Sequence, residues 1–587
     1  MKNLSSVKNY LAENKKDVLI FSVILLVILN FLVLNIYVIS QVPLFDDGTY
    51  HASIVREMRN QERIIDYSPV GWVMSPILIP ISLKPVVQHL PLFYLTNTVL
   101  TCFVDNVELS MTITNLLSII FLIVIFFKLL KNIFSKPVAF YSSILLAFAP
   151  MFLIVTGIRL MEGLLYFFGI ITIYQYFKYL KRSSIRNTAT LVLFITTLFW
   201  LKITSIFLVL AIFVHFLIKN KPKKTLFIFI VILFLSLPLF DFMINTNGTI
   251  SGTPPGIPII DKYIFNPWWN WDRAEWDNQM TIDSDWLYYE EKMKLFGGSR
   301  TPTLQDNLKS VNISNLVQYF SIYPTFVSGR LGEYTPLADT SNLLFLLIFI
   351  LGVIVYLKLG LRNKNEKNFI FLLLILGMCY IPFFMAPGAL FRHSFFLQIL
   401  CTVFFGNAIY FITQKIKIMR IVKICFIGIL VISLVSVSIK ETENLLRYKY
   451  SFGHVIMSTG GRIELREVSR EIMIPENENI FAPSEEICWY MNRPVVWDYR
   501  IFFVPKEKVS AYFKHFNASY LIIPHYMLKR SINGKPNIKE NWIKHVYSIP
   551  TDSGFYELLE EGKYFKKVKD YKAFTVYKFE HNIQNDN

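Results

Sequence analysis

The 587-residue chain is 53% hydrophobic and 16% aromatic, and its mean hydropathy is +0.43. This composition lies outside the usual range of soluble globular proteins and indicates a polytopic membrane protein. The formal net charge of +17 would suit a nucleic-acid partner, but Lys and Arg are concentrated in short segments between the apolar runs. We therefore attribute the charge to membrane topology and expect no nucleic-acid partner.

The first predicted element is an apolar run over residues 18–40, which follows Lys2, Lys8, Lys15 and Lys16. At about 22 residues, its apolar stretch is too long for an ordinary signal peptide, so it predicts an uncleaved membrane anchor. The basic residues before it place the N-terminus in the cytoplasm by the positive-inside rule.

Two adjacent carboxylates, Asp46 and Asp47, follow this span within the segment Pro43-Leu44-Phe45-Asp46-Asp47-Gly48-Thr49-Tyr50. Apolar neighbours would partly desolvate both acids, and two carboxylates so close oppose each other's ionisation, which suits one of them to accept a proton. An Asp-Asp-Gly sequence is also typical of a polar turn after a membrane helix. The residues alone leave both interpretations open.

Residues 41–107 form the first predicted outer loop. Its stretch from Pro91 to Val104 is apolar but too short to cross a membrane, so it predicts a helix in the membrane interface or a re-entrant segment.

Ten further apolar runs complete a set of about eleven predicted spans. They cover residues 108–130, 138–156, 161–179, 188–201, 203–218, 225–244, 341–358, 368–387, 394–414 and 421–439. Basic segments alternate with loops that are poor in Lys and Arg, as expected for cytoplasmic and outer connections. This topology places Asp46, Asp47, Glu162, Lys202 and Arg392 on the outer side.

A second predicted outer loop covers residues 245–340, and the hydropathy falls after residue 439. We therefore divide the chain into a membrane module, 1–440, and a soluble extracytoplasmic α/β domain, 441–587. In this domain, residues 464–473 and 509–516 predict helices, and residues 479–483, 494–497, 520–523 and 574–579 predict strands. No Walker A sequence or Gly-x-Gly-x-x-Gly fingerprint supports nucleotide binding.

Several short motifs with charged or aromatic residues follow one another along the chain. Asp46-Asp47 is followed by Tyr50 and Arg56-Glu57-Met58, and then by His89-Leu90-Pro91-Leu92-Phe93-Tyr94, Arg159-Leu160-Met161-Glu162 and Arg392. This series resembles the lipid-phosphate-sugar glycosyltransferases of the GT-C fold, namely the protein O-mannosyltransferase and aminoarabinose-transferase group of glycosyltransferase family 39. Asp47 stands where the family has Glu, Leu90 where it has Pro, and Glu162 where it has Asp.

The resemblance implies a polytopic α-helical GT-C-like enzyme that takes a sugar from a polyprenyl-phosphate-linked donor. The acceptor would be a protein, a lipid or a glycan at the outer face of a plasma membrane. Asp46 would be the base for an inverting displacement, and Asp47 would tune that base or hold the acceptor.

The same resemblance suggests substrate-binding roles for further residues. Arg392 and His393 would bind the leaving phosphate, Lys202 is a further phosphate ligand, Glu162 would orient the acceptor, and His89 and Tyr50 would contact substrate. Snorkelling by Lys202, interfacial anchoring by Arg392 and helix capping by Glu162 are the structural alternatives. Asp46, Asp47 and Glu162 would also suit Mg²⁺ or Mn²⁺, which leaves the metal unassigned.

Three other functions use a similar set of spans. A polysaccharide polymerase or ligase also takes lipid-linked sugars but would depend on outer-loop Arg and His residues. A transporter of lipid-linked sugars would carry charges near the bilayer centre. A noncatalytic scaffold would tolerate neutralisation of both acids.

Overall fold

The computed structural model describes most of the predicted membrane helices and parts of the C-terminal region. The described residues are 47–60, 72–74, 91–219, 222–247, 340–359, 363–385, 391–415, 461–475, 478–482, 485–491, 495–497, 517–525, 554–562, 564–572 and 574–580, with pieces of 29–44, 421–439 and 509–513. Asp46, His89, most of the first span and the outer loop 248–339 lie outside the described residues.

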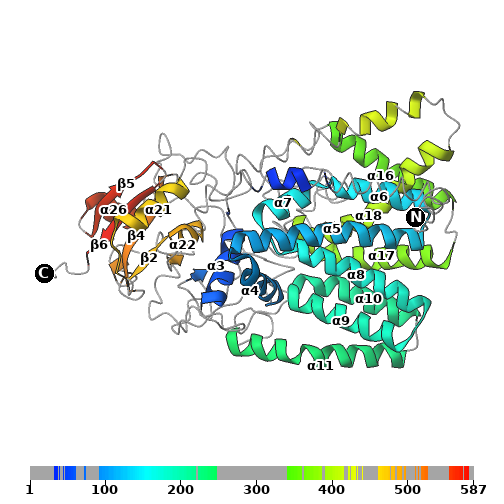
Figure 1. The fold of residues 1–587 in the computed structure, drawn as a ribbon, viewed down its shortest axis with the longest axis horizontal. Helices are drawn as coiled ribbons and strands as arrows, with labels where there is room; N and C mark the ends of the chain where they lie inside the picture. The colour runs from blue at the N-terminus through cyan, green and yellow to red at the C-terminus, as the bar shows by residue number, and fades with distance from the viewer. Residues whose placement is uncertain are drawn as a thin grey trace, which may run out of the picture.

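Helices occupy nearly all of the predicted spans that the structure describes. They are α5 (Val107–Ile133), α6 (Lys136–Ala147), α7 (Pro150–Ile158), α8 (Glu162–Lys181), α9 (Ile185–Leu201), α10 (Ile206–Lys219), α11 (Pro222–Asn247), α16 (Thr340–Leu359), α17 (Lys364–Met385) and α18 (Phe391–Tyr410). A π-helical turn, Phe411–Lys415, follows α18, and the 3-10 turn η1 (Ile203–Ser205) precedes α10. These helices run side by side, with the C-terminal sheet beyond one end of them (Figure 1).

The predicted span 138–156 is broken into α6 and α7, which are bent by 45°. Pro150 starts α7 and Ala149 before it is extended, because the residue before a proline is driven out of the helical region. Within the described residues, three helices are long and apolar enough to cross a membrane, or four with the bent pair. The eleven crossings therefore stay a prediction, although the helix positions agree with them.

Two shorter helices belong to the first outer loop. These are α3 (Asp47–Asn60) and α4 (Leu92–Val104), and α4 confirms the predicted helix over this apolar stretch. Asn97 ties α4 to α5, since its side-chain oxygen accepts hydrogen bonds from Thr114 (2.8 Å) and Ser110 (3.2 Å). Buried polar groups need such partners, so this network sets how α4 lies on α5.

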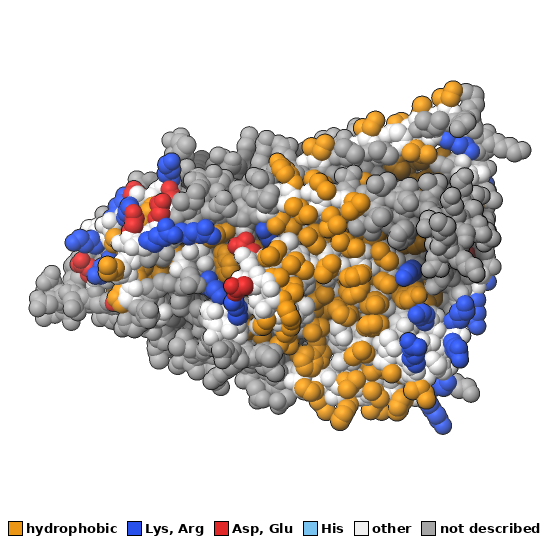
Figure 2. Space-filling view, viewed as in Figure 1, with side chains coloured by type: hydrophobic (Ala, Val, Ile, Leu, Met, Phe, Trp, Pro, Cys, Tyr) orange, Lys and Arg blue, Asp and Glu red, His pale blue; other side chains and the backbone are white. Residues whose placement is uncertain are grey.

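The charge on the surface of the helical region changes along the helix axes. Figure 2 shows a broad apolar surface over the helices, with Lys and Arg gathered at the end far from the sheet. Lys131, Lys181, Lys219 and Lys358 lie in the last turns of α5, α8, α10 and α16. Cations near helix C-termini are favoured by the helix dipole, and the sheet end has both signs of charge.

A mixed six-stranded sheet forms the other part of the structure, in the order β1-β3-β2-β4-β6-β5. Its strands are β1 (Trp72–Met74), β2 (Asn479–Phe481), β3 (Val495–Trp497), β4 (Ala518–Pro524), β5 (Phe565–Asp570) and β6 (Phe574–Phe579). The first four are parallel, and β6 pairs antiparallel with both β4 and β5. Helices α21 (Gly461–Glu471), α22 (Glu485–Met491) and α26 (Gly554–Glu561) accompany them.

The predicted strands at 479–483, 494–497, 520–523 and 574–579 are confirmed with small shifts at their ends. The strand β5 was missed because its sequence Phe565-Lys-Lys-Val-Lys-Asp570 has a buried residue only at its start. It is an edge strand, where lysines discourage pairing with other chains. The strand β1 was missed because it comes from the first predicted outer loop, far in sequence from β3. No local pattern indicates that these two strands pair in parallel.

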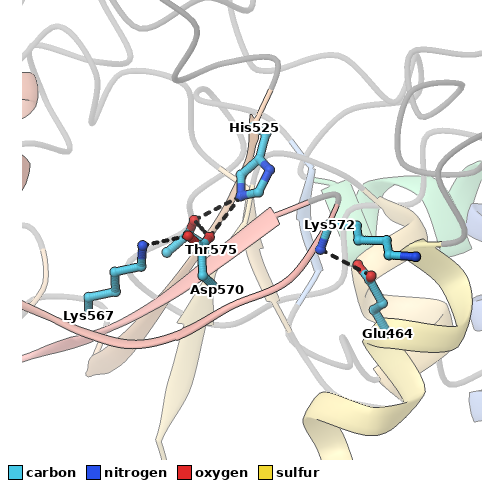
Figure 3. Close-up of polar contacts among 6 residues, drawn as sticks. All are labelled: Glu464, His525, Lys567, Asp570, Lys572 and Thr575. Carbon is cyan, nitrogen blue, oxygen red and sulfur yellow. Dashed lines mark hydrogen bonds and ion pairs between the residues drawn. The ribbon is translucent and has the colours of Figure 1, made fainter.

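A polar cluster joins the end of β4 to the β5–β6 hairpin (Figure 3). The Asp570 carboxylate accepts hydrogen bonds from Lys567 (2.5 Å) and Thr575 (2.5 Å), and His525 Nε2 lies 2.9 Å from it. Burial alone would raise the pKa of Asp570, but these three hydrogen bonds outweigh it and lower the pKa to about 2. The ionised carboxylate therefore stabilises the folded hairpin.

We expect Asp570→Asn to weaken this hairpin at neutral pH and to have little effect in acid. The folded carboxyl titrates at about 2 and an unfolded one near 3.8, so its stabilisation is complete above pH 5 and lost as the pH falls towards 2. Since its side chain is 49% exposed, the loss at pH 7 should be about 1 kcal/mol or less. Amide exchange of β5 and β6, compared with wild type at pH 7 and pH 3, checks this.

Lys572→Gln is the control, because only the backbone N–H of Lys572 contacts Glu464. An exchange difference for Asp570→Asn that is as large at pH 3 as at pH 7 would contradict the role of the ionised carboxylate.

Gly406 is where α18 approaches α6 most closely. A Cβ atom added there would lie 2.6 Å from the Val138 carbonyl oxygen and 2.9 Å from the Ser142 nitrogen. These are backbone atoms, which cannot rotate away. A Cβ at Gly377 in α17 would meet nothing within 4 Å.

We expect Gly406→Ala to destabilise the helical region by about 1–3 kcal/mol, the usual cost of overpacking. Gly377→Ala adds the same methyl group in open space and should be neutral or slightly stabilising. Thermal unfolding of the two variants in detergent compares them directly, and equal melting temperatures would show that the helices can separate at Gly406 without cost.

Candidate functional site

The start of α3 is the first part of the candidate site. Asp47 is the first residue of this helix and Tyr50 lies in its first turn, while the side chains of both fall outside the described part of the structure. Backbone N–H groups at a helix start favour nearby negative charge. Asp47 of the predicted pair occupies such a helix start.

Gly48 brings the start of α3 against the end of α7. A Cβ atom at Gly48 would lie 1.9 Å from the Ile158 carbonyl oxygen, so this close backbone contact requires glycine. Ile158 is followed by Arg159, whose backbone is left-handed with φ 63°. The Arg159 side chain is buried and donates hydrogen bonds to the carbonyls of Gly157 and Ile39.

Sequence neighbours of several predicted site residues share one buried apolar cluster. It contains Leu44, Ala52, Val55, Met58, Phe93, Tyr94, Val107, Met111, Met161, Leu164 and Leu201. Met161 precedes Glu162, and Leu201 precedes Lys202. Three parts of the chain near predicted site residues therefore contribute to this cluster: α3 together with Leu44 just before it, the start of α8 and the end of α9.

Glu162 and Lys202 form a buried ion pair. The Lys202 Nζ lies 2.6 Å from the Glu162 Oε1, and their side chains are 6% and 1% exposed, respectively. Glu162 is in the first turn of α8, and Lys202 is the extended residue that ends α9. Two charges at such depth are stable only when they are paired and hydrogen-bonded. The sequence interpretation considered both residues, and the structure adds that they contact each other.

The C-terminal region supplies contacts that the sequence interpretation did not include. The Tyr490 hydroxyl in α22 donates a hydrogen bond of 2.6 Å to the Leu44 carbonyl. Arg56 in α3 donates to the Trp489 carbonyl at 3.3 Å and lies over its ring, 4.8 Å from the ring centre. No spacing within the sequence signals contacts between residues more than 400 positions apart.

His51 was not considered in the sequence, and Tyr94 was named there only as part of a motif, without a predicted contact. His51 Nδ1 lies 3.0 Å from the Tyr94 hydroxyl, and both side chains are buried between α3 and α4. Tyr94 belongs to the motif that begins at His89, but only its apolar character was used to predict α4. This contact joins the acid-bearing helix to the neighbouring loop helix.

The other predicted site residues are only partly described. Arg392 and His393 lie in the first turn of α18, but their side chains fall outside the described residues, as do all of His89 and Asp46. Among the described residues, no group of three or more His, Cys, Asp or Glu side chains is placed to hold a metal ion. Neither the phosphate-binding roles nor a Mg²⁺ or Mn²⁺ site is tested by this geometry.

Comparison with known sequences identifies a related region. Residues 88–243 match the family model of dolichyl-phosphate-mannose-protein mannosyltransferase. The match covers the His89 segment, Arg159, Glu162 and Lys202, and it begins after the Asp46-Asp47 pair. No curated protein sequence matches the chain.

Solved structures with a similar fold cover most of the chain. The apo form of ArnT from Cupriavidus metallidurans has a TM-score of 0.54 at 12% identity, over 97% of this chain and 99% of that chain. ArnT bound to undecaprenyl phosphate has a TM-score of 0.51 at 11% identity, over 96% and 98%. The oligosaccharyltransferase AglB from Archaeoglobus fulgidus, in complex with an inhibitory peptide and a dolichol-phosphate, has a TM-score of 0.52 at 14% identity, over 87% and 70%.

These similarities confirm the membrane GT-C fold that the order of motifs predicted, and they agree with the family match over residues 88–243. The chain is therefore similar to the lipid-phosphate-sugar glycosyltransferases of the GT-C fold.

Proposed function

We propose that this protein is an integral membrane glycosyltransferase that moves a sugar from a polyprenyl-phosphate-linked donor to an acceptor. The observation that carries the proposal is the shared buried cluster: Leu44, two residues before Asp46, and the apolar face of α3 belong to the same cluster as Met161 and Leu201, the neighbours of the Glu162–Lys202 ion pair. The family match covers the latter two residues. The similar structures that contain undecaprenyl phosphate or dolichol-phosphate add support for a lipid-linked donor.

The proposed reaction is a single displacement with inversion. The acceptor hydroxyl oxygen attacks the anomeric carbon of the sugar, its proton passes to the Asp46 carboxylate, and the bond from the anomeric carbon to the phosphate oxygen breaks. The polyprenyl phosphate leaves with the electron pair of that bond. Asp47, at the start of α3, would hold the acceptor or tune the base, because its negative charge makes Asp46 a better proton acceptor.

The leaving phosphate needs cations, and we assign Lys202, Arg392 and His393 to it. An ammonium group has three donors, so Lys202 can keep its contact of 2.6 Å with Glu162 and still donate to a phosphate. Glu162 would then hold Lys202 in place or orient the acceptor, with His89 and Tyr50 as further substrate contacts. Mg²⁺ or Mn²⁺, if bound, would be held by Asp46, Asp47 and Glu162 and would neutralise phosphate charge.

We further propose that the N-terminus is cytoplasmic in the plasma membrane and that the sheet region is extracytoplasmic. The lysines at the ends of α5, α8, α10 and α16 support this orientation. In the proposed division, residues 1–440 form the membrane module and 441–587 the outer domain, to which the first loop adds β1. The lipid tail of the donor would stay in the bilayer while its sugar reaches the boundary.

Replacing Asp46 with Asn should abolish transfer while the protein remains folded, because the amide cannot accept the proton. Loss of a general base typically costs about 10²–10⁴-fold in rate. Mass spectrometry of envelope glycans and polyprenyl-phosphate sugars should show loss of one sugar and accumulation of its lipid-linked donor.

Asp105→Asn is the matched control. Asp105 is an exposed acid of the same predicted loop, lies at the end of α4 and pairs with Arg59 of α3. It should leave the glycans unchanged. Wild-type glycans in the Asp46→Asn strain at equal protein levels would overturn the base assignment and favour a transporter or a scaffold.

Two variants should distinguish the contribution of the Glu162–Lys202 pair to stability from its contribution to sugar transfer. Lys202→Met leaves the buried Glu162 without this ammonium, which typically costs about 3–5 kcal/mol, whereas the double variant Glu162→Gln/Lys202→Met removes both charges and should recover most of that loss. Thermal unfolding in detergent measures the difference. If Lys202 contacts the donor phosphate, the double variant folds but its strain still accumulates the lipid-linked donor. Wild-type glycans in that strain would show that the pair contributes only to stability.

A further inference from the structure

The C-terminal region holds the first outer loop at more than one place. The strand β1 from this loop pairs in parallel with β3, with Trp72 opposite Val495 and Met74 opposite Trp497. The helix α3 from the same loop packs against α22. The loop that carries the acid pair is therefore joined to the sheet region by its own backbone as well as by side chains.

Tyr490 in α22 contacts the chain just before the acid pair. Its hydroxyl donates to the carbonyl oxygen of Leu44 at 2.6 Å, and Leu44 and Tyr490 are 0% and 6% exposed, respectively. Asp46 is two residues from Leu44, a separation that spans at most about 7 Å of chain. A buried carbonyl needs a donor, so this hydrogen bond fixes the backbone just before the acid pair.

Gly48 fixes the backbone just after the pair. Its close approach to the Ile158 carbonyl leaves no room for a Cβ atom. Asp46 and Asp47 thus lie between two anchored residues, Leu44 and Gly48, one held by the C-terminal region and the other by the end of α7. Arg56, over the Trp489 ring, adds a third contact two turns further along α3.

We propose that Tyr490 is a positioning residue for the acid pair, and that α22 thereby makes the C-terminal region part of the catalytic apparatus. The inference rests on the proposed function, because it assigns Tyr490 a role through Asp46. Tyr490 itself touches no reacting atom. Its hydroxyl sets the place from which the base meets the acceptor hydroxyl, and a small displacement of a base lowers the rate more than it lowers substrate binding.

Two variants test this from opposite sides of the pair. Tyr490→Phe removes the donor to Leu44, and Gly48→Ala pushes the start of α3 away from Ile158. Their controls are Tyr571→Phe, which removes a hydroxyl bonded to Glu471 elsewhere in the C-terminal region, and Gly377→Ala, which adds a methyl group in open space. The full-length protein is used in every case.

The donor for the assay is the lipid-linked sugar purified from the Asp46→Asn strain. Rates are expressed per binding site, counted by titration with undecaprenyl phosphate, so that unfolded protein does not contribute. We expect kcat to fall roughly tenfold to a hundredfold in Tyr490→Phe and Gly48→Ala, with KM and the affinity for undecaprenyl phosphate unchanged. Both controls should keep the wild-type kcat.

The outcomes separate the two proposals. No donor accumulation in the Asp46→Asn strain overturns the proposed function, and the positioning role with it. Donor accumulation in that strain together with a wild-type kcat per site in Tyr490→Phe overturns the positioning role alone. A raised KM with unchanged kcat also overturns it, because Tyr490 would then act on donor binding. If Tyr490→Phe does not fold, Arg56→Gln, which loosens the other contact of α3 with α22, replaces it, and a wild-type kcat per site in that variant overturns the positioning role of α22.

Discussion

The end of the helical region nearest the sheet depends on the need of buried polar groups for partners inside the protein. A charge or carbonyl removed from water is costly unless another protein group replaces the lost hydrogen bonds. Lys202 with Glu162, Arg159 with the carbonyls of Gly157 and Ile39, and Tyr490 with Leu44 all meet this need. Lys202 with Glu162, Arg159 with Ile39 and Tyr490 with Leu44 each join two different parts of the chain, so the contacts that satisfy these polar groups also hold the elements together.

This arrangement suits chemistry on a substrate that is half lipid. A polyprenyl tail needs an apolar surface, which the exposed sides of the helices provide (Figure 2), and a phosphate needs cations where the apolar surface ends. The buried Lys202 is held in place by its hydrogen bond to Glu162. A cation that is already fixed loses little side-chain freedom when it binds a ligand, which is the general advantage of a preorganised site.

The C-terminal region does more than follow the membrane helices along the chain. Its sheet includes β1 from the first outer loop, and its helix α22 contacts α3. The loop between the first two predicted spans is therefore shared by both parts of the protein. The boundary at residue 440 was predicted from hydropathy, and β1 from before that boundary pairs with β3 from after it.

The sequence by itself determined the membrane class, the positions of the helices and most of the C-terminal strands, because hydrophobic runs and alternation are local properties of the chain. The ordered motifs also predicted the GT-C fold. The pairing of Lys202 with Glu162, the strand β1 and the contact of Tyr490 with Leu44 were decided only by the tertiary structure. These contacts join residues 40 to more than 400 positions apart, and such pairings depend on how the helices and the sheet pack in space, which no local pattern records.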